Sequence, residues 1–213
     1  MWIVFITCST FLFNFRCQKD EMRPFDQEFE IPLSITPLKK TYSITDTIWL
    51  EAEVTGKQLR DRKVNAEVLA DTGKLFFTAS YYGFGTGLSK PAGGFCDVIT
   101  SNGVNTNRRL EEWSSVASID NYGCTQTSYR FKIGFKPNHK GTYSLLMPKD
   151  LLFFSCPNKV VPYHASSSYK FTAADLNVDV FNELANNENF GKDTRNHYTE
   201  KLSNKELFVF RVE

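Results

Sequence analysis

The sequence predicts an all-β protein, an antiparallel β-sandwich with one short helix near its C-terminal part. From residue 29 onward, apolar side chains mostly alternate with polar or small ones, which is the two-residue period of a half-buried strand. Gly, Pro, Asn and Asp separate these short runs and favour antiparallel pairing. Only Leu176, Val180, Phe181 and Leu184 have good helical spacing, so a fold of alternating β and α units is excluded.

Each expected element begins or ends at a residue typical of turns or caps. Pro37 closes the first strand, and Gly56 ends the second. Asp71-Thr72-Gly73 predicts a hairpin turn between the third and fourth strands. Asp175 is expected to cap the helix. The expected strands cover residues 29–35, 48–54, 64–68, 74–82, 129–135, 143–145 and 206–212.

Three segments are expected to be loops. Residues 83–94 are the most glycine-rich stretch of the chain, residues 101–112 are polar, and residues 185–205 are rich in Asn and charge. Loops carried on a rigid sandwich are the usual place for binding, so these segments are the expected location of a ligand or partner.

The composition fits one globular domain, and its charge specifies no partner. In a chain of 213 residues that is 41% hydrophobic, Lys and Arg number 25 and Asp and Glu number 24. This balance excludes a strongly basic nucleic-acid binder and an acidic solvating tail. Aromatic and β-branched residues are plentiful, which argues against intrinsic disorder. We therefore expect an ordered body without a nucleic-acid partner.

The first 16 residues are expected to be an export signal. Residues 2–13 carry no charge, and such a run suits the apolar core of a signal peptide, which has about 7–15 residues. The run is shorter than the ~20 residues that a membrane-spanning helix needs. Arg16 and the charged residues after it end the run. A buried first strand is the alternative interpretation of the same residues.

Residues 17–21, Cys-Gln-Lys-Asp-Glu, resemble the start of a mature bacterial lipoprotein. In such proteins the cysteine after the signal is lipidated on its sulfur and becomes the new N-terminus, which implies lipidation at Cys17. Lys19, Asp20 and Glu21 are similar to the export signal of surface lipoproteins from the Bacteroidetes group. The resemblance implies a protein held in the outer membrane by its N-terminal lipid and exposed at the cell surface.

A lipid anchor also agrees with the energetics of membrane binding. Each buried CH₂ of an acyl chain contributes about 0.8 kcal/mol, so one chain holds a protein marginally and several hold it firmly. The expected organisation has three parts: a signal peptide at residues 1–16, a lipidated N-terminus and tether at residues 17–27, and a single β-sandwich domain at residues 28–213.

Two short motifs in the body resemble those of immunoglobulin-like domains on bacterial surface proteins. Residues 42–50, Tyr-Ser-Ile-Thr-Asp-Thr-Ile-Trp-Leu, are similar to a strand opening that places Gly-Asp-Thr after a tyrosine, with Thr45 in place of the glycine. Residues 140–143, Lys-Gly-Thr-Tyr, are similar to the Gly-x-Tyr start of a late strand in those domains. The resemblance implies an immunoglobulin-like sandwich and no particular ligand.

The sequence contains no motif that specifies catalysis, a metal site or a cofactor. The glycines of residues 83–94 lack the spacing and the Lys-Ser/Thr order of a phosphate-binding loop. Ser166 or Ser167 could form a hydrolytic triad with a histidine and Asp175, but no nucleophile elbow surrounds either serine. We therefore predict a protein that is not an enzyme and that has no cofactor and no metal site.

Three cysteines remain in the body, and an oxidising envelope favours a disulfide between two of them. Cys96, Cys124 and Cys156 allow three single bridges. We favour Cys96–Cys124, because that bridge would close a polar loop of about thirty residues and stabilise the fold by about 3–4 kcal/mol in the chain-entropy model. Cys156 follows the apolar run at residues 151–154 and is expected to be a buried free thiol.

Three functional hypotheses remain open. The leading one is a non-enzymatic, lipid-anchored cell-envelope protein whose sandwich presents loops to an unknown protein or glycan. The alternative is a carbohydrate-binding or carbohydrate-active surface protein, because Trp113, Tyr81 and Tyr82 lie near the expected loops and Glu111-Glu112 adjoins Trp113. The third is a structural subunit of a larger envelope complex.

Overall fold

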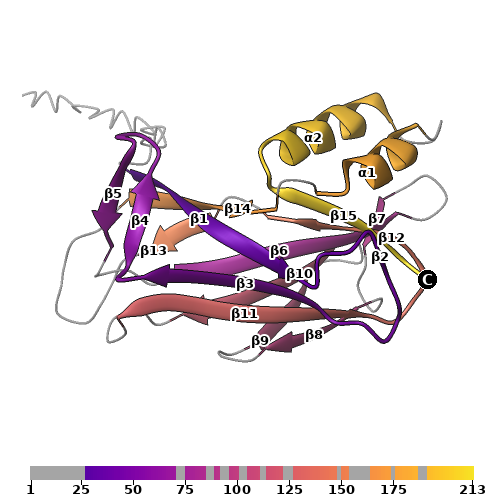
Figure 1. Ribbon diagram of the computed structural model, residues 1–213, viewed down its shortest axis with the longest axis horizontal. Coiled ribbons are helices and arrows are strands. Elements are labelled where there is room, and N and C mark those ends of the chain that lie inside the picture. Colours follow the sequence, from indigo (N-terminus) through magenta and orange to yellow (C-terminus); the bar gives the residue numbers. More distant parts are fainter. Residues whose placement is uncertain are drawn as a thin grey trace, which may run out of the picture.

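The computed structural model confirms the all-β prediction. Two sheets, mostly antiparallel, pack face to face around a shared core (Figure 1). The structure describes residues 27–70, 75–84, 89–91, 96–100, 105–110, 114–121, 127–147, 150–153, 164–173, 176–186 and 191–213.

Within these residues the first sheet has eight strands. Its main path follows the order β13, β14, β1, β3, β11, β8, and β4 pairs both with β1 and with β5. The strands are β1 (Gln27–Thr36), β3 (Ile48–Thr55), β4 (Gln58–Asp61), β5 (Ala66–Leu69), β8 (Cys96–Thr100), β11 (Ser128–Pro137), β13 (Asp150–Phe153) and β14 (His164–Phe171).

The second sheet has seven strands in the described part of the chain. Its order is β2, β15, β12, β6, β10, β9, and β7 pairs with β6. The strands are β2 (Thr41–Tyr42), β6 (Leu75–Phe84), β7 (Ser89–Pro91), β9 (Asn105–Leu110), β10 (Ser114–Asn121), β12 (Gly141–Leu146) and β15 (Leu207–Val212).

The alternation seen in the sequence places one face of each strand in the core. Residues 29, 31, 33 and 35 of β1 point inward, as do residues 48, 50, 52 and 54 of β3. Phe208 and Phe210 of β15 meet them from the second sheet, with ring centroids 5.6 Å apart. Burying a large apolar side chain contributes about 1.5–3 kcal/mol, so this shared core is the main source of stability.

Strand β15 is buried on both faces, which explains its unbroken run Leu207-Phe208-Val209-Phe210. Phe208 and Phe210 face the sandwich core, while Leu207 and Val209 join a second cluster under two helices. The helices are α1 (Val178–Ala185) and α2 (Lys192–Ser203), and they cover the outer side of β15 (Figure 1). The predicted helix is confirmed as α1. The expectation that Asp175 caps it was wrong, because the N-cap position is held by Asn177, while Asp175 lies outside the described residues.

The prediction of a single helix and of a loop at residues 185–205 was wrong, because α2 occupies most of that segment. Its sequence lacks an apolar stripe, and Tyr198 is its one fully buried side chain. A helix that buries so little apolar surface gives almost no periodic signal, and its polar composition resembles that of a loop.

Two other expected loops also contain strands. Residues 105–110 of the polar segment 101–112 form β9, an edge strand that pairs with β10. In the glycine-rich segment 83–94, β7 pairs with the end of β6. Short edge strands are held by backbone bonds on one side and need little apolar patterning.

The expected hairpin through Asp71-Thr72-Gly73 was also wrong. Strand β5 pairs with β4, a strand that was not expected, and β6 lies in the other sheet. The chain therefore passes between sheets after β5. Among the described strands, β1 pairs with β14 and β2 with β15 in parallel, and the other pairs are antiparallel.

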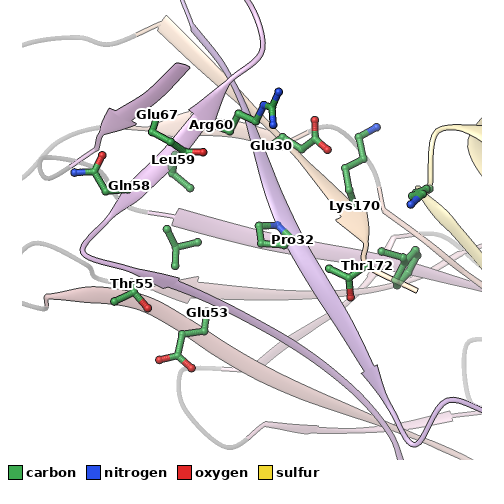
Figure 2. Close-up of a pocket in the computed structure, with 13 residues that line it drawn as sticks. Glu30, Pro32, Glu53, Thr55, Gln58, Leu59, Arg60, Glu67, Lys170 and Thr172 are labelled. Carbon is green, nitrogen blue, oxygen red and sulfur yellow. The ribbon is translucent and has the colours of Figure 1, made fainter. Parts of the chain in front are cut away.

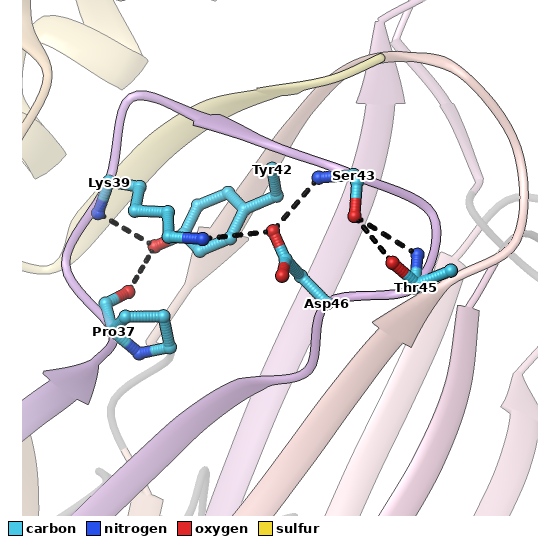
Figure 3. A network of polar contacts seen from close by, with 6 residues as sticks. All are labelled: Pro37, Lys39, Tyr42, Ser43, Thr45 and Asp46. Atoms are coloured by element: carbon cyan, nitrogen blue, oxygen red, sulfur yellow. Dashed lines mark hydrogen bonds and ion pairs between the residues drawn. The ribbon is translucent and has the colours of Figure 1, made fainter.

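The motif at residues 42–50 forms a closed turn between β2 and β3 (Figure 3). The Tyr42 hydroxyl donates to the Pro37 carbonyl at 2.6 Å and accepts the Lys39 N–H at 3.1 Å. Burial raises the pKa of Tyr42 to about 12. The Asp46 carboxylate accepts the Ser43 N–H at 2.9 Å, which holds the pKa of Asp46 below its usual value. These residues fix the path of the chain into β3.

No helix in the described part of the chain has the length and apolar character needed to cross a membrane.

Ser144 gives a first stability prediction. Its side chain on β12 is fully buried, and its hydroxyl has no hydrogen-bond partner among the described residues. An unpaired buried hydroxyl destabilises the folded state, because it has lost its hydrogen bonds to water. Ser144→Ala is therefore expected to raise the free energy of unfolding by about 1 kcal/mol. Urea denaturation measures the change, and a loss of stability would show that the hydroxyl has a partner in solution.

Candidate functional site

The first sheet contains an opening between three of its strands, which we call the sheet opening (Figure 2). Strand β1 pairs with β3 only from Ser34 to Thr36, and with β4 only at Phe29 and Glu30. Strand β3 meanwhile stays paired with β11 as far as Thr55. Strands β1 and β3 therefore diverge, and β4 closes the wide end of the triangle between them.

Pro32 lies at the point where the β1–β3 ladder stops (Figure 2). Ser34 is paired with Glu51, so one step along the same register would bring Pro32 opposite Glu53. Even-numbered residues of β1 present their backbone groups to β4 and β3, as the bond from the Arg62 N–H to the Glu28 carbonyl at 2.8 Å shows. Proline has no N–H, so the Glu53 carbonyl receives no donor from β1 at this position.

A turn with left-handed backbone carries the chain from β3 to β4. Gly56 and Lys57 have φ angles of 62° and 54°. Glycine adopts such angles without strain, whereas Lys57 is held there by its surroundings. The Lys57 side chain is buried with its ammonium 5.5 Å from the centre of the Tyr129 ring, and its carbonyl accepts the Ala70 N–H. This turn sets the width of the sheet opening.

The sheet opening has an apolar floor and a polar rim. Val54, Leu59 and Phe171, all buried, form the floor. The volume is about 510 Å³, within the range of pockets that hold small molecules or short chain segments. The charged side chains around the rim are Glu30, Glu53, Arg60, Glu67, Lys170 and Lys205, and Figure 2 shows Glu53 and Glu67 on the opposite side of Pro32 from Lys170.

A half-buried ionic cluster supports the basic side of the rim. Lys170 donates to Glu206 at 2.5 Å, and Lys201 donates to the other carboxylate oxygen of Glu206 at 2.8 Å. Burial by itself would raise the pKa of Glu206, but the two lysines outweigh burial and hold this pKa below its ordinary value of 4.5. The cluster joins β14 and α2 to the residue that precedes β15, and it holds the Lys170 ammonium against Glu206.

Removing the carboxylate of this cluster gives a second prediction. Because the pKa of Glu206 is lowered by folding, its stabilisation is complete above its ordinary value of 4.5 and is lost as the pH falls below it. Glu206→Gln is expected to lower the free energy of unfolding by about 1–2 kcal/mol at pH 7. Between pH 5 and pH 3 the variant is expected to lose less stability than the parent protein. Urea denaturation at several pH values measures both effects.

Asp179 provides the matched control for Glu206. It pairs with Lys40 at 2.7 Å, but both side chains are more than half exposed. Water screens such a pair, so Asp179→Asn is expected to leave stability unchanged within error. Equal losses in the two variants would contradict the role assigned to the Glu206 cluster.

The residues predicted from the N-terminal sequence are not in the described part of the structure. Cys17, Lys19, Asp20 and Glu21 precede Gln27, where the description begins. Lipidation at Cys17 and the export signal at the three charged residues therefore stay predictions.

Of the body cysteines, only Cys96 lies among the described residues. It lies at the start of β8 and forms no disulfide with another described residue. Its side chain is half-buried against the main core, and burial raises the pKa of its thiol far above the usual value. Cys124 and Cys156 lie outside the described residues, so the Cys96–Cys124 bridge and the free thiol at Cys156 stay predictions.

Trp49 does not present an open aromatic face. It lies on the outer face of β3, opposite Gly134 of β11, and the Lys132 ammonium stands 5.1 Å from the centre of its ring. Tyr81 and Tyr82 lie on β6, opposite Leu145 and Ser144 of β12. Trp113, Glu111 and Glu112 are outside the described residues.

The structure also places the two serines that were considered for a hydrolytic triad. Ser166 and Ser167 are buried in β14, and their hydroxyls have no hydrogen-bond partner among the described residues. Asp175 is not described. No group of three or more His, Cys, Asp or Glu side chains in the described ranges could hold a metal ion.

Sequence reasoning missed the sheet opening, although one signal pointed to it. Pro32 interrupts the alternating run of residues 29–35, and proline inside a sheet normally marks an edge or a local break in pairing. The other rim residues come from β3, β4, β5, β14 and the turn before β15, which only the fold brings together.

No known family model matches the chain, and no curated protein resembles it to a significant degree. The fold and the site define it as a two-sheet β protein with a ligand-sized opening in one sheet.

Proposed function

We propose that this chain is a non-enzymatic protein of the bacterial cell envelope, held in the outer membrane by a lipid on Cys17 and exposed at the cell surface. Its sandwich acts as a binding module for a protein or glycan partner, and the sheet opening is the place of binding. The observation that carries the binding role is the opening itself, with its apolar floor, charged rim and volume of about 510 Å³. The anchor is supported by the sequence of residues 1–27.

We also infer an immunoglobulin-like arrangement of the sandwich. The bond from the Tyr143 hydroxyl to the His139 carbonyl at 2.9 Å supports it, because tyrosines near the start of late strands make such bonds in immunoglobulin-like domains. The tyrosine belongs to the motif at residues 140–143 that suggested the resemblance.

Metabolic labelling tests the anchor. Cells that express the protein are fed an alkyne fatty acid, and the protein is isolated and coupled to a fluorophore. Cys17→Ala is expected to abolish the signal, while Cys96→Ala, which changes a buried thiol of the body, is expected to keep it. Labelling of the Cys17 variant at the original level would refute the anchor.

A carbohydrate ligand is the alternative, and a glycan array distinguishes it. Sugar sites commonly use aromatic platforms, but among the described residues Phe171 is the one aromatic side chain that lines the opening, and it is buried in the floor. We therefore expect no glycan to be bound. A glycan that the protein retains, and that is lost when rim residues are changed, would make the ligand of the opening a carbohydrate.

A further inference from the structure

We propose that the sheet opening binds an extended peptide that ends in a free carboxylate, with one apolar side chain of the peptide in the opening. The proposal rests on the binding role proposed above and names its ligand class. Three features of the described residues carry it: a part of the β3 edge to which β1 offers no N–H, an apolar floor and unequal charge at the two sides of the rim.

The first feature is the edge of β3. The Glu53 carbonyl faces Pro32 of β1. Because proline has no N–H, β1 offers this carbonyl no hydrogen-bond donor. An extended peptide in the opening can supply that N–H. Addition of a strand to an exposed edge is a common mode of peptide recognition, because backbone bonds give affinity while pockets select alternate side chains.

The second feature is the floor. Val54, Leu59 and Phe171 present carbon surface at the bottom of a triangle whose sides are strand backbones. Side chains alternate between the two faces of an extended peptide, so a single residue points into the triangle while its neighbours point to solvent. The opening thus selects an apolar side chain at one position.

The third feature is the unequal charge at the two sides of the opening. Lys170 and Lys201 both pair with Glu206, and Lys205 lines the same side of the opening. These three lysines exceed by one the two carboxylates of that side, Glu206 and Glu30 (Figure 2). Glu53 and Glu67 stand at the opposite side, toward β4 and β5 (Figure 2). A terminal carboxylate is attracted to the lysine side and repelled from the glutamate side, which fixes the direction of the peptide.

Isothermal titration calorimetry with three peptides tests the ligand class. The probes are acetyl-Ala-Val-Ala with a free carboxylate, the same peptide as its amide, and the acid with an N-methyl group on valine. The full chain in mild detergent is expected to bind the acid with a dissociation constant on the order of 10⁻⁴ M. The amide and the N-methyl peptide are each expected to bind at least tenfold more weakly.

Two pairs of variants localise the binding. Pro32→Val restores an N–H opposite Glu53, so it is expected to close the β1–β3 ladder, protect its own amide from hydrogen exchange and weaken the acid at least tenfold. Ser34→Val, two residues further along the same face of β1, is expected to leave binding unchanged. Lys205→Glu is expected to weaken the acid but not the amide, whereas Lys140→Glu, at an exposed turn, changes neither.

Several results would overturn the proposal. Equal affinity for acid and amide would exclude recognition of the carboxylate, and equal affinity for the N-methyl peptide would exclude the strand-edge bond. If octanoate binds at the lysine side and no peptide does, the ligand is a fatty acid. If no probe binds at 10 mM, the opening does not bind peptides of this class. Fatty-acid labelling of Cys17 is independent of all these results, so failure of the peptide ligand and failure of the anchor can be told apart.

Discussion

Asn177→Ala is expected to lower the free energy of unfolding by about 2–4 kcal/mol. Asn177 precedes α1 with φ 61° and ψ 47°, a left-handed conformation that asparagine tolerates and alanine does not. Its side-chain amide is 4% exposed and donates to the Lys39 carbonyl at 3.0 Å and to the Val209 carbonyl at 2.7 Å. The substitution therefore removes two buried hydrogen bonds and strains the backbone.

Asn177→Gly separates the two contributions. Glycine loses the same hydrogen bonds but adopts the left-handed conformation freely, so it is expected to recover about 1 kcal/mol relative to alanine. Urea denaturation followed by circular dichroism measures both variants. A glycine variant no more stable than the alanine variant would show that backbone strain contributes nothing at this position.

Hydrogen exchange would show which elements lose stability in the Asn177→Ala variant. Asn177 joins the connection after β1 to β15, on which both helices pack. We expect faster exchange in α1 and α2 and unchanged exchange in β11, which is remote from these contacts. Uniformly faster exchange would indicate that the helices and the sandwich unfold as one unit.

The strands that face the core could be predicted from the sequence, because burial on one face imposes a period of two. Residues 29–35 and 48–54 show this period and form β1 and β3. Strand β15 could be predicted as well, since its four consecutive apolar residues require cover on both faces. The helix α1 is visible because Val180 and Phe181 lie on its buried side.

The elements that the sequence did not reveal are those with little buried surface. Helix α2 buries Tyr198 and part of Leu202 while its other residues are polar. Strand β9 is an edge strand paired on one side. A single sequence also does not show which sheet a strand joins after a turn. Asp71-Thr72-Gly73 is typical of a hairpin, yet β5 and β6 lie in different sheets because β5 completes its pairing with β4.

The candidate site could not be predicted as a whole for a related reason. Its rim combines β1, β3, β4, β5, β14 and the turn at Lys205, which are separated in the chain by up to 175 positions between Glu30 and Lys205. Only Pro32 carries a local signal, the loss of a donor within an alternating run. The expectation that binding would occur on loops gave no weight to a break inside a sheet.

Gly134→Val is expected to destabilise the protein by about 2 kcal/mol, through crowding on the outer face of the first sheet. Gly134 of β11 is the cross-strand partner of Trp49, and a Cβ atom built on it would lie 2.8 Å from the Thr47 methyl group and 2.9 Å from the Trp49 ring. Valine has a higher strand propensity than glycine, by up to about 1 kcal/mol. A valine variant that is more stable than the parent protein would therefore indicate that the Trp49 ring can move aside.

Lys132→Ala is the matched control for Gly134→Val, because it removes the cation 5.1 Å from the Trp49 ring without filling the space beneath it. That contact is partly exposed, so its loss is expected to cost less than about 1 kcal/mol. Urea denaturation measures stability. Valine is expected to push the Trp49 ring toward water and so to shift the tryptophan emission to the red, whereas the other tryptophans are common to all variants. A stabilised valine variant with unchanged emission would show that the close packing of Trp49 on Gly134 does not exist in solution.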